Sequence, residues 1–379
     1  MRRFAYLLIL AGFGAPMEAA EITVQAPAVQ RTVSLDPADP AWQKAPAASI
    51  ALMPQGMVRP WGGGAVKRVE ARALYTPQEL FVRLQWEDKN ADLTPSASQS
   101  FTDACAIMLP ARAGSWPSPF MGDAQNPVVI WRWSAAAQKD VDEGYQAAEA
   151  AHPRLHYDFE PRPNDPLYRA AQGAGNPLAE RERTTPVEFL AAKGYGSLTS
   201  QPDERVRGKG VWKDGQWTVV MAKPLQGTPT LAKAGRVPIS FAVWDGGAGE
   251  RNGLKAVSIW QSLALGPVSA LPERTPAARG ERVFRRYGCA VCHGPGGRGG
   301  VKSDNAQGGL VPPINKVKEG FTEEEVKQVV RRGRSSVPED PSGPTPPLHM
   351  NAWSQVMDER ELDDLVKYLW TLAPETQEW

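Results

Sequence analysis

Residues Cys289-Ala290-Val291-Cys292-His293 decide how the C-terminal part of this chain has to fold. They form the pattern C-x-x-C-H, which is the attachment motif of a c-type haem. Both thiols bond to one rigid macrocycle and the adjacent imidazole binds its iron, so all three groups have to come from a single turn of chain. A zinc site would need a second pair of cysteine or histidine ligands, and a chain with 3 Cys and 4 His does not supply one. The motif therefore predicts covalent haem at Cys289 and Cys292, with His293 as an iron ligand.

The residues around this motif favour helices. Apolar side chains at 283–287 share one helical face. A capping-box pattern begins at Thr322 and predicts a helix over 322–332, and apolar residues at helical spacing predict a final helix over 358–370. A helix, a C-x-x-C-H loop and a last helix resemble a class I cytochrome c domain. The resemblance implies an all-α domain, which we expect at 278–379.

The loop over 346–353 should supply the second axial ligand of the c haem. Class I cytochromes place a methionine in this loop, so the resemblance implies Met350. A sulfur ligand opposite histidine favours the ferrous state and raises the redox potential. Two other ligands stay open, namely His349, which would lower the potential, and Met357.

The N-terminus has the layout of an export signal. Arg2 and Arg3 precede an apolar run at 4–13, and small residues follow up to Ala20. This layout predicts a signal peptide over 1–20 and a periplasmic protein. No later run is apolar enough for a transmembrane segment, and a net charge of +1 gives no indication of a nucleic-acid partner.

Residues 21–271 are expected to form a β-rich domain. Short runs of β-branched and aromatic residues, such as 79–86 and 217–221, alternate with Gly, Pro, Asp and Asn. This pattern predicts an antiparallel β-sandwich, joined to the cytochrome domain by a linker at 272–277. Asp214-Gly215 is typical of a tight hairpin turn.

The β pattern weakens between Ser134 and Arg207, where Ala, Pro and charged residues are frequent. We expect a long helical or irregular insertion in this segment, with a short helix at 186–193. Cys105 lies in an apolar, strand-like run. Because haem uses the two other cysteines, Cys105 is interpreted as a buried core thiol.

A set of short stretches in the β-rich part carries a second resemblance. The stretches are Pro119-Phe120-Met121-Gly122-Asp123, 128–133, 187–199, 210–220, 241–246 and 252–260. In this order they resemble the γ-subunit family of ethylbenzene dehydrogenase. That family comprises the haem-b subunits of related molybdenum enzymes of the DMSO reductase superfamily.

This second resemblance implies a non-covalent b haem, held by the β-sandwich between a methionine and a lysine. The methionine corresponds to Met121 and the lysine to Lys255, with Lys223 as the rival lysine. A lysine binds iron only when it is deprotonated, so burial has to lower its pKa. His152 and His156 are interpreted as surface residues of the insertion.

Together these features predict a dihaem electron-transfer subunit without a substrate site of its own, and hence not an enzyme. It would relay electrons between iron–sulfur clusters of a molybdenum oxidoreductase complex and a soluble redox protein. Its partners would be the iron–sulfur and molybdenum subunits of that complex. The alternative is a sugar- or ligand-binding β-sandwich tethered to a monohaem cytochrome c. Four tryptophans are candidates for its carbohydrate platform, namely Trp61, Trp116, Trp131 and Trp133.

Overall fold

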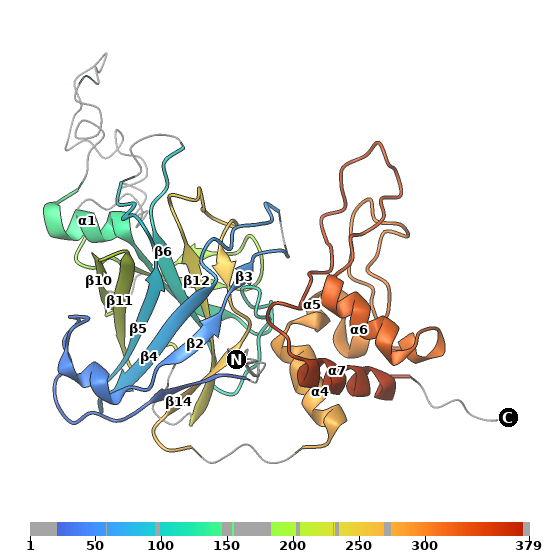
Figure 1. The fold of residues 1–379 in the computed structure, drawn as a ribbon, viewed down its shortest axis with the longest axis horizontal. Helices are drawn as coiled ribbons and strands as arrows, with labels where there is room; N and C mark the ends of the chain where they lie inside the picture. Colours follow the sequence, from blue (N-terminus) through green and yellow to red (C-terminus); the bar gives the residue numbers. More distant parts are fainter. Residues whose placement is uncertain are drawn as a thin grey trace, which may run out of the picture.

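A sheet-rich part precedes a helical C-terminal part in the computed structural model, and Figure 1 shows the two lying side by side. The structure describes residues 21–373 apart from 58, 95–98, 146–153, 155–182, 202–204, 230, 232–234 and 269–273. The expected signal peptide, His152 and His156 therefore lie outside the described residues.

Two sheets make up the sheet-rich part. The nine-stranded sheet has the order β1-β14-β12-β6-β7-β8-β9, with β13 paired to both β12 and β3. The five-stranded sheet has the order β10-β11-β5-β4-β2. The strands of the first sheet are β1 (Thr23–Ala26), β3 (Met53–Pro54), β6 (Ala104–Pro110), β7 (Val128–Ser134), β8 (Val187–Ala192), β9 (Thr199–Ser200), β12 (Arg236–Trp244), β13 (Ala256–Val257) and β14 (Gln261–Leu265). Those of the second are β2 (Ala48–Ala51), β4 (Arg68–Tyr75), β5 (Glu79–Glu87), β10 (Arg207–Lys213) and β11 (Gln216–Pro224).

One strand pair departs from the antiparallel pattern that the sequence predicts. β1 and β14 run parallel, whereas the other paired strands are antiparallel. A parallel pair needs a long connection between its strands, and 239 residues separate the bonded residues Ile22 and Gln261 at this edge. The expectation of a purely antiparallel arrangement is therefore wrong at this pair.

The nine-stranded sheet is buried on both faces. Successive side chains of a strand point to opposite faces, and a separate apolar cluster covers each face. In β7, Val129, Trp131 and Trp133 belong to a core to which both sheets contribute, hereafter the inner core. Val128 and Ile130 point the other way. They belong to a second apolar cluster, hereafter the outer face, with Ala104, Ala106, Met108, Leu190, Ala192, Trp244 and Trp260. Trp131 and Trp133 are 0% exposed, so these two cannot form a carbohydrate platform.

The segment 186–193, where the sequence suggests a short helix, contains the strand β8 instead. β8 pairs with β7, and it places Phe189 in the inner core and Leu190 on the outer face. Burial on both faces of a sheet outweighs the helix preference of its Leu and Ala residues. The insertion does contain a helix, α1 (Ala135–Glu143), which begins after Ser134.

Two local predictions in the sheet-rich part are confirmed. Asp214 and Gly215 have φ angles of 52° and 79° and join β10 to β11, as a two-residue hairpin turn requires. Cys105 is fully buried in β6 and forms no disulfide. Burial raises the pKa of its thiol, which makes Cys105 an unreactive core residue.

The helical part consists of α4 (Pro276–Arg286), α5 (Cys289–His293), α6 (Glu323–Arg332) and α7 (Glu359–Thr371), with 3₁₀ turns η3 (Pro295–Gly297) and η4 (Val317–Glu319). The expected capping box is confirmed, because the Thr322 side chain accepts from the backbone N–H of Glu325 while the Glu325 carboxylate accepts from that of Thr322. Apolar residues of these helices and their loops form one cluster, hereafter the helical core. Within the described part of the chain, no helix is both long and apolar enough to cross a membrane.

Gly280 is the point at which α4 comes closest to α7. A Cβ atom at this position would lie 1.8 Å from the backbone oxygen of Asp364, and that backbone moves only if the helices separate. We expect Gly280→Ala to lower the free energy of unfolding by about 3 kcal/mol, the upper end of the usual cost of overpacking. Denaturant titration of the purified protein measures this change.

Gly320→Ala is the matched control for this prediction. A Cβ atom at Gly320 meets nothing within 4 Å, and its φ of −131° is open to any residue. The control should change the free energy of unfolding by less than about 0.5 kcal/mol. Equal effects of the two substitutions would contradict a close helix contact at Gly280.

Candidate functional site

α5 brings both cysteines and the histidine of the C-x-x-C-H motif onto one helical turn. It begins after Gly288, whose φ of 70° redirects the chain at the end of α4. Cys289 and Cys292 are half-buried and form no disulfide. The two thiols are therefore available to bond a single group that lies against this turn.

His293 is arranged as a neutral metal ligand. Its Nδ1 atom lies 3.5 Å from the carbonyl oxygen of Pro312. An Nδ1–H that donates to a carbonyl leaves the lone pair on Nε2, the usual arrangement for histidines that bind metals. Burial lowers the pKa of His293, which favours the neutral imidazole. The donor set of this turn thus fits a covalent haem.

Met350 and His349 adjoin in sequence and contact different neighbours. Met350 exchanges two backbone hydrogen bonds with Arg334, each 2.9 Å long, and its side chain packs at the edge of the helical core, as Cys289 does. His349 meets Trp61 of the sheet-rich part edge-on, with ring centroids 4.3 Å apart. Met350 therefore shares a core with the motif, whereas the imidazole of His349 is engaged by the sheet-rich part.

Met357, the third candidate for the distal position, is a core residue. Its side chain is 8% exposed and belongs to the helical core itself. A methionine in this setting fills space between helices. It directly precedes Asp358, the N-cap residue of α7, and packing against the helices explains its burial without an iron ligand.

The loop between β6 and β7 carries Met121 onto the outer face. Met121 packs against this cluster and has a φ of 69°, which is uncommon for a residue other than glycine. The turn is held by the Asp123 carboxylate, which accepts from the backbone N–H groups of Ser118 and Asn126. The carbonyl oxygen of Met121 accepts from Gly194 N–H at 2.8 Å. Because these bonds impose a strained conformation, the surrounding structure fixes where Met121 lies.

Lys255 reaches the outer face from the residues just before β13. Its Nζ lies 4.9 Å from the ring centroid of Trp244, a member of the outer face. The residue as a whole is half-buried, but burial of its ammonium group lowers the pKa of Lys255 to about 8, with the charge of Arg132 as a second cause. A lysine with a lowered pKa gives up its proton more readily and then offers a nitrogen lone pair.

The rival Lys223 lies on the other side of the nine-stranded sheet. Its side chain is 1% exposed, and its Nζ lies 5.1 Å from the ring centroid of Phe189. Phe189 belongs to the inner core, whereas Met121 packs on the outer face. Lys223 and Met121 are therefore separated by the sheet, and of the two lysines Lys255 is the one that shares the outer face with Met121.

Comparison with known proteins gives the relationship of the chain. Residues 39–256, more than half of its length, match the family described as Ethylbenzene dehydrogenase. The chain belongs to the ethylbenzene dehydrogenase family. Residues 277–373 match Cytochrome c, so this family member also contains a cytochrome c domain, which implies haem c. Both resemblances expected from the sequence are confirmed.

Three relatives of this ethylbenzene dehydrogenase family chain are named as subunits. The chlorate reductase subunit gamma of Ideonella dechloratans is 29% identical over 262 residues, which are 65% of this chain and 90% of the relative. The dimethylsulfide dehydrogenase subunit gamma of Rhodovulum sulfidophilum is 26% identical over 252 residues, 62% of this chain and 77% of the relative. ORF7 of Haloferax mediterranei, provisionally named a respiratory nitrate reductase heme subunit, is 27% identical over 237 residues, 61% and 68% of the two chains.

The segments that carry the candidate ligands touch each other in this family member. A Cβ atom at Gly288, directly before the haem motif, would lie 2.7 Å from the ring of Phe120. Phe120 adjoins Met121, and Gly288 adjoins Cys289. The loop that positions Met121 therefore rests against the start of the helix that carries the haem thiols.

Further contacts hold the helical part against the sheets. Met53 and Ile259 of the sheet-rich part are buried members of the helical core. Arg282 of α4 donates two hydrogen bonds of 2.7 Å to the carboxylate of Glu21, and its guanidinium lies 5.0 Å from the ring centroid of Trp116. Apolar and charged contacts together give the two candidate ligand sets a defined relative position.

Sequence reasoning missed the residues that join the two parts of this ethylbenzene dehydrogenase family chain. Phe120, Gly288 and Trp61 make contacts across the junction, and no local pattern marks such contacts. The one available signal was position, since Phe120 and Gly288 each adjoin a predicted haem ligand.

Proposed function

We propose that this chain is a dihaem electron-transfer subunit that works in the periplasm. It relays electrons between iron–sulfur clusters of a molybdenum oxidoreductase complex and an external redox protein, and it has no substrate site of its own. The observation that carries the proposal is the contact between Phe120 and Gly288, which brings the loop of Met121 against the helix of Cys289. The relatives named as gamma or heme subunits support the same role.

In this proposal Met121 and Lys255 bind the iron of a b haem on the outer face of a β-sandwich. The Lys255 ammonium lies over the Trp244 ring beside an apolar cluster, and burial makes its charged form less favourable and lowers its pKa. A neutral amine bound to a metal removes that cost. The strained backbone of Met121 likewise has a reason if it sets the direction of the thioether.

The c haem is attached to Cys289 and Cys292, with His293 and Met350 as iron ligands in an all-α cytochrome domain. The carbonyl of Pro312 orients the imidazole through Nδ1, and the backbone bonds with Arg334 hold the loop of Met350. When bound, the two haems supply one-electron redox chemistry at potentials that their axial ligands set. Two protein ligands to each iron would leave no coordination position for a substrate.

The fusion of the two parts has a physical advantage for such a subunit. The junction residues keep the two haem-binding segments in contact, so no diffusive encounter between separate proteins is needed. Electron input and output then depend on two partner surfaces, one for the iron–sulfur subunit and one for the external redox protein. The substrate of the complex is set by its molybdenum subunit.

A pyridine haemochrome spectrum of the full chain, expressed with export and cytochrome c maturation, tests the proposal. We expect one b haem and one c haem per chain, and acidic solvent extraction should remove only the b haem because thioether bonds retain the other. One c haem alone, in protein produced with ample haem, would contradict the b-haem assignment. Protein without covalent haem would contradict the c-haem assignment.

A further inference from the structure

Four aspartates gather where the strands β5, β6 and β12 begin or end. Asp88 directly follows β5, Asp103 directly precedes β6 and Asp245 directly follows β12. One carboxylate oxygen from each of these three lies within 4.8 Å of the others. Asp92 joins them, since a Cβ atom on Gly247 would lie 2.8 Å from its Oδ2 and 3.3 Å from Oδ1 of Asp245.

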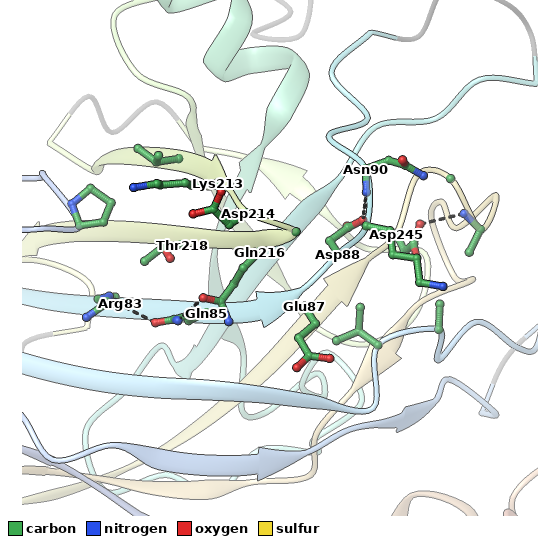
Figure 2. Close-up of a pocket in the computed structure, with 18 of the residues that line it drawn as sticks. Arg83, Gln85, Glu87, Asp88, Asn90, Lys213, Asp214, Gln216, Thr218 and Asp245 are labelled. Atoms are coloured by element: carbon green, nitrogen blue, oxygen red, sulfur yellow. Dashed lines mark hydrogen bonds between the residues drawn. The ribbon is translucent and has the colours of Figure 1, made fainter.

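Asp88 and Asp245 line a cavity of about 1000 Å³ that extends along β5, β10 and β11. Figure 2 shows Asp88 and Asp245 next to each other among the residues that line it. The lining is mainly polar and charged. Water therefore has access to the cluster from this side.

The hydrogen bonds of the described residues leave part of the cluster without a partner. Asp103 is 0% exposed, and its oxygens accept from Gly246 N–H, Trp217 Nε1–H and Asp92 N–H. Asp88 is 7% exposed, and its Oδ1 accepts from Asn90 N–H at 3.2 Å. Oδ2 of Asp88 is buried and has no hydrogen-bond partner in the described part of the chain. A buried carboxylate oxygen in that state points to a missing cation or proton.

Like charges surround this orphaned oxygen. The charged neighbours that act on Asp88 are Asp103, Asp245 and Asp92, and each of them is negative. Burial, followed by these charges, raises the pKa of Asp88 to about 7, and burial raises that of Asp103 to about 6. Several ionised carboxylates at this separation are unfavourable unless a positive charge lies among them.

We propose that Asp88, Asp92, Asp103 and Asp245 bind a calcium ion. All four are hard oxygen donors, the ligand type that Ca²⁺ prefers, and water from the cavity can complete its shell of 6–8 oxygens. Two oxygens bound to one Ca²⁺ at about 2.4 Å lie at most about 4.8 Å apart, and one oxygen each of Asp88, Asp103 and Asp245 meets this condition. Asp92 adjoins these three beside Asp245. The ion ties the ends of β5, β6 and β12 together, and so joins the two sheets at the end where they carry these aspartates.

The loop after β5 has a spacing that suits this role. Asp88-Lys89-Asn90-Ala91-Asp92 places oxygen-bearing side chains at alternate positions, as the first half of a calcium-binding loop of the EF-hand type does. The loop departs from that type at Leu93, where the EF-hand pattern has glycine. Asp103 and Asp245 take the place of the later ligands, so the site is assembled from three separate segments.

Calcium titration of the full chain, treated first with EDTA, tests the proposal by calorimetry and by thermal unfolding. We expect one Ca²⁺ per chain with a Kd on the order of 10⁻⁵ M. At about 1 mM Ca²⁺ the Tm should rise by about 5 °C. Mg²⁺ should bind at least about tenfold more weakly, because it demands a smaller, octahedral shell.

Asp88→Asn should weaken Ca²⁺ binding by at least about tenfold, because ligand charge sets the affinity of such sites. Glu87→Gln is the matched control, since Glu87 lines the same cavity, adjoins Asp88 and is exposed. It should leave Ca²⁺ affinity within about twofold. Should Asp88→Asn fail to fold, Asp245→Asn, at a half-buried position, makes the same test.

The competing explanation is a proton shared between Asp88 and Asp103. In that case Ca²⁺ gives no binding heat and no rise in Tm, and Asp88→Asn leaves the protein as stable as before or more so. Either result would overturn the calcium site. The proposal does not rest on the haem assignments, so a protein with a single haem would leave it unchanged.

Discussion

Met121→Ala and Lys255→Ala are each expected to remove the b-type haem from the purified protein, while the c-type haem stays at one per chain. A non-covalent haem depends on its axial bonds and on the apolar surface beneath it. Each substitution deletes one bond, and the outer face cannot supply a replacement donor at that point. We expect the b-haem content to fall at least about tenfold, which corresponds to a loss of about 1.4 kcal/mol of binding free energy or more.

Lys223→Met is the matched control for the lysine. The Lys223 side chain is fully buried, but it lies in the inner core beside Phe189. Its replacement by an apolar residue of similar length should leave the b haem in place. Haemochrome spectra of the three variants, normalised to the covalent c haem in the same sample, measure the ratio of b to c haem directly.

Two outcomes would reject the assignment. If Lys223→Met removed the b haem and Lys255→Ala retained it, the ligand would lie on the opposite face of the sheet from the one proposed. If neither lysine mattered while Met121→Ala removed the haem, the second ligand would be of a different kind. Normal c-haem content in every variant excludes general misfolding as the cause of a loss.

Local patterns account for what could be predicted from the sequence. The Cys289–His293 motif needs one helical turn, and the Thr322 capping box needs four consecutive residues, so both are complete within a short stretch. The hairpin at Asp214-Gly215 is equally local. The strand β8 could not be predicted in this way, because β7 pairs with its edge and residues far away in the sequence cover its two faces.

The choice between the two lysines also needed the folded chain. Residues 217–223 of β11 alternate in and out, and pairing with β5 sets which set faces the inner core. Only the folded chain places Lys223 in the inner core and Lys255 on the outer face, where Met121 also packs. The resemblance left Lys223 as a rival to Lys255, and strand pairing places the two lysines on different faces of the nine-stranded sheet, which favours Lys255 as the proposed ligand. Similarly, the contact of Phe120 with Gly288 joins residues that are far apart in the sequence, so neither residue alone reveals it.

Met350→His is expected to lower the midpoint potential of the c haem by an amount on the order of 100 mV. Replacing a thioether with an imidazole removes the ligand that favours ferrous iron, and the backbone bonds with Arg334 keep the new side chain at the same place in the loop. Redox titration of the covalent haem band measures the shift. The b haem, where present, serves as an internal reference whose potential should move far less.

His349→Ala separates this assignment from its rival. The ring centroids of His349 and Trp61 lie 4.3 Å apart, so loss of the imidazole should loosen the junction of the two parts. The potential of the c haem should stay within about 20 mV of that of the unchanged protein. A bis-histidine site would behave in the opposite way: His349→Ala would raise the potential, and Met350→Leu would leave it unchanged. Since His349 and Met350 are adjacent, only one of them can face the iron from an extended loop. The contact that the sheet-rich part makes with His349 therefore favours Met350 as the proposed distal ligand, and the two potentials test that choice.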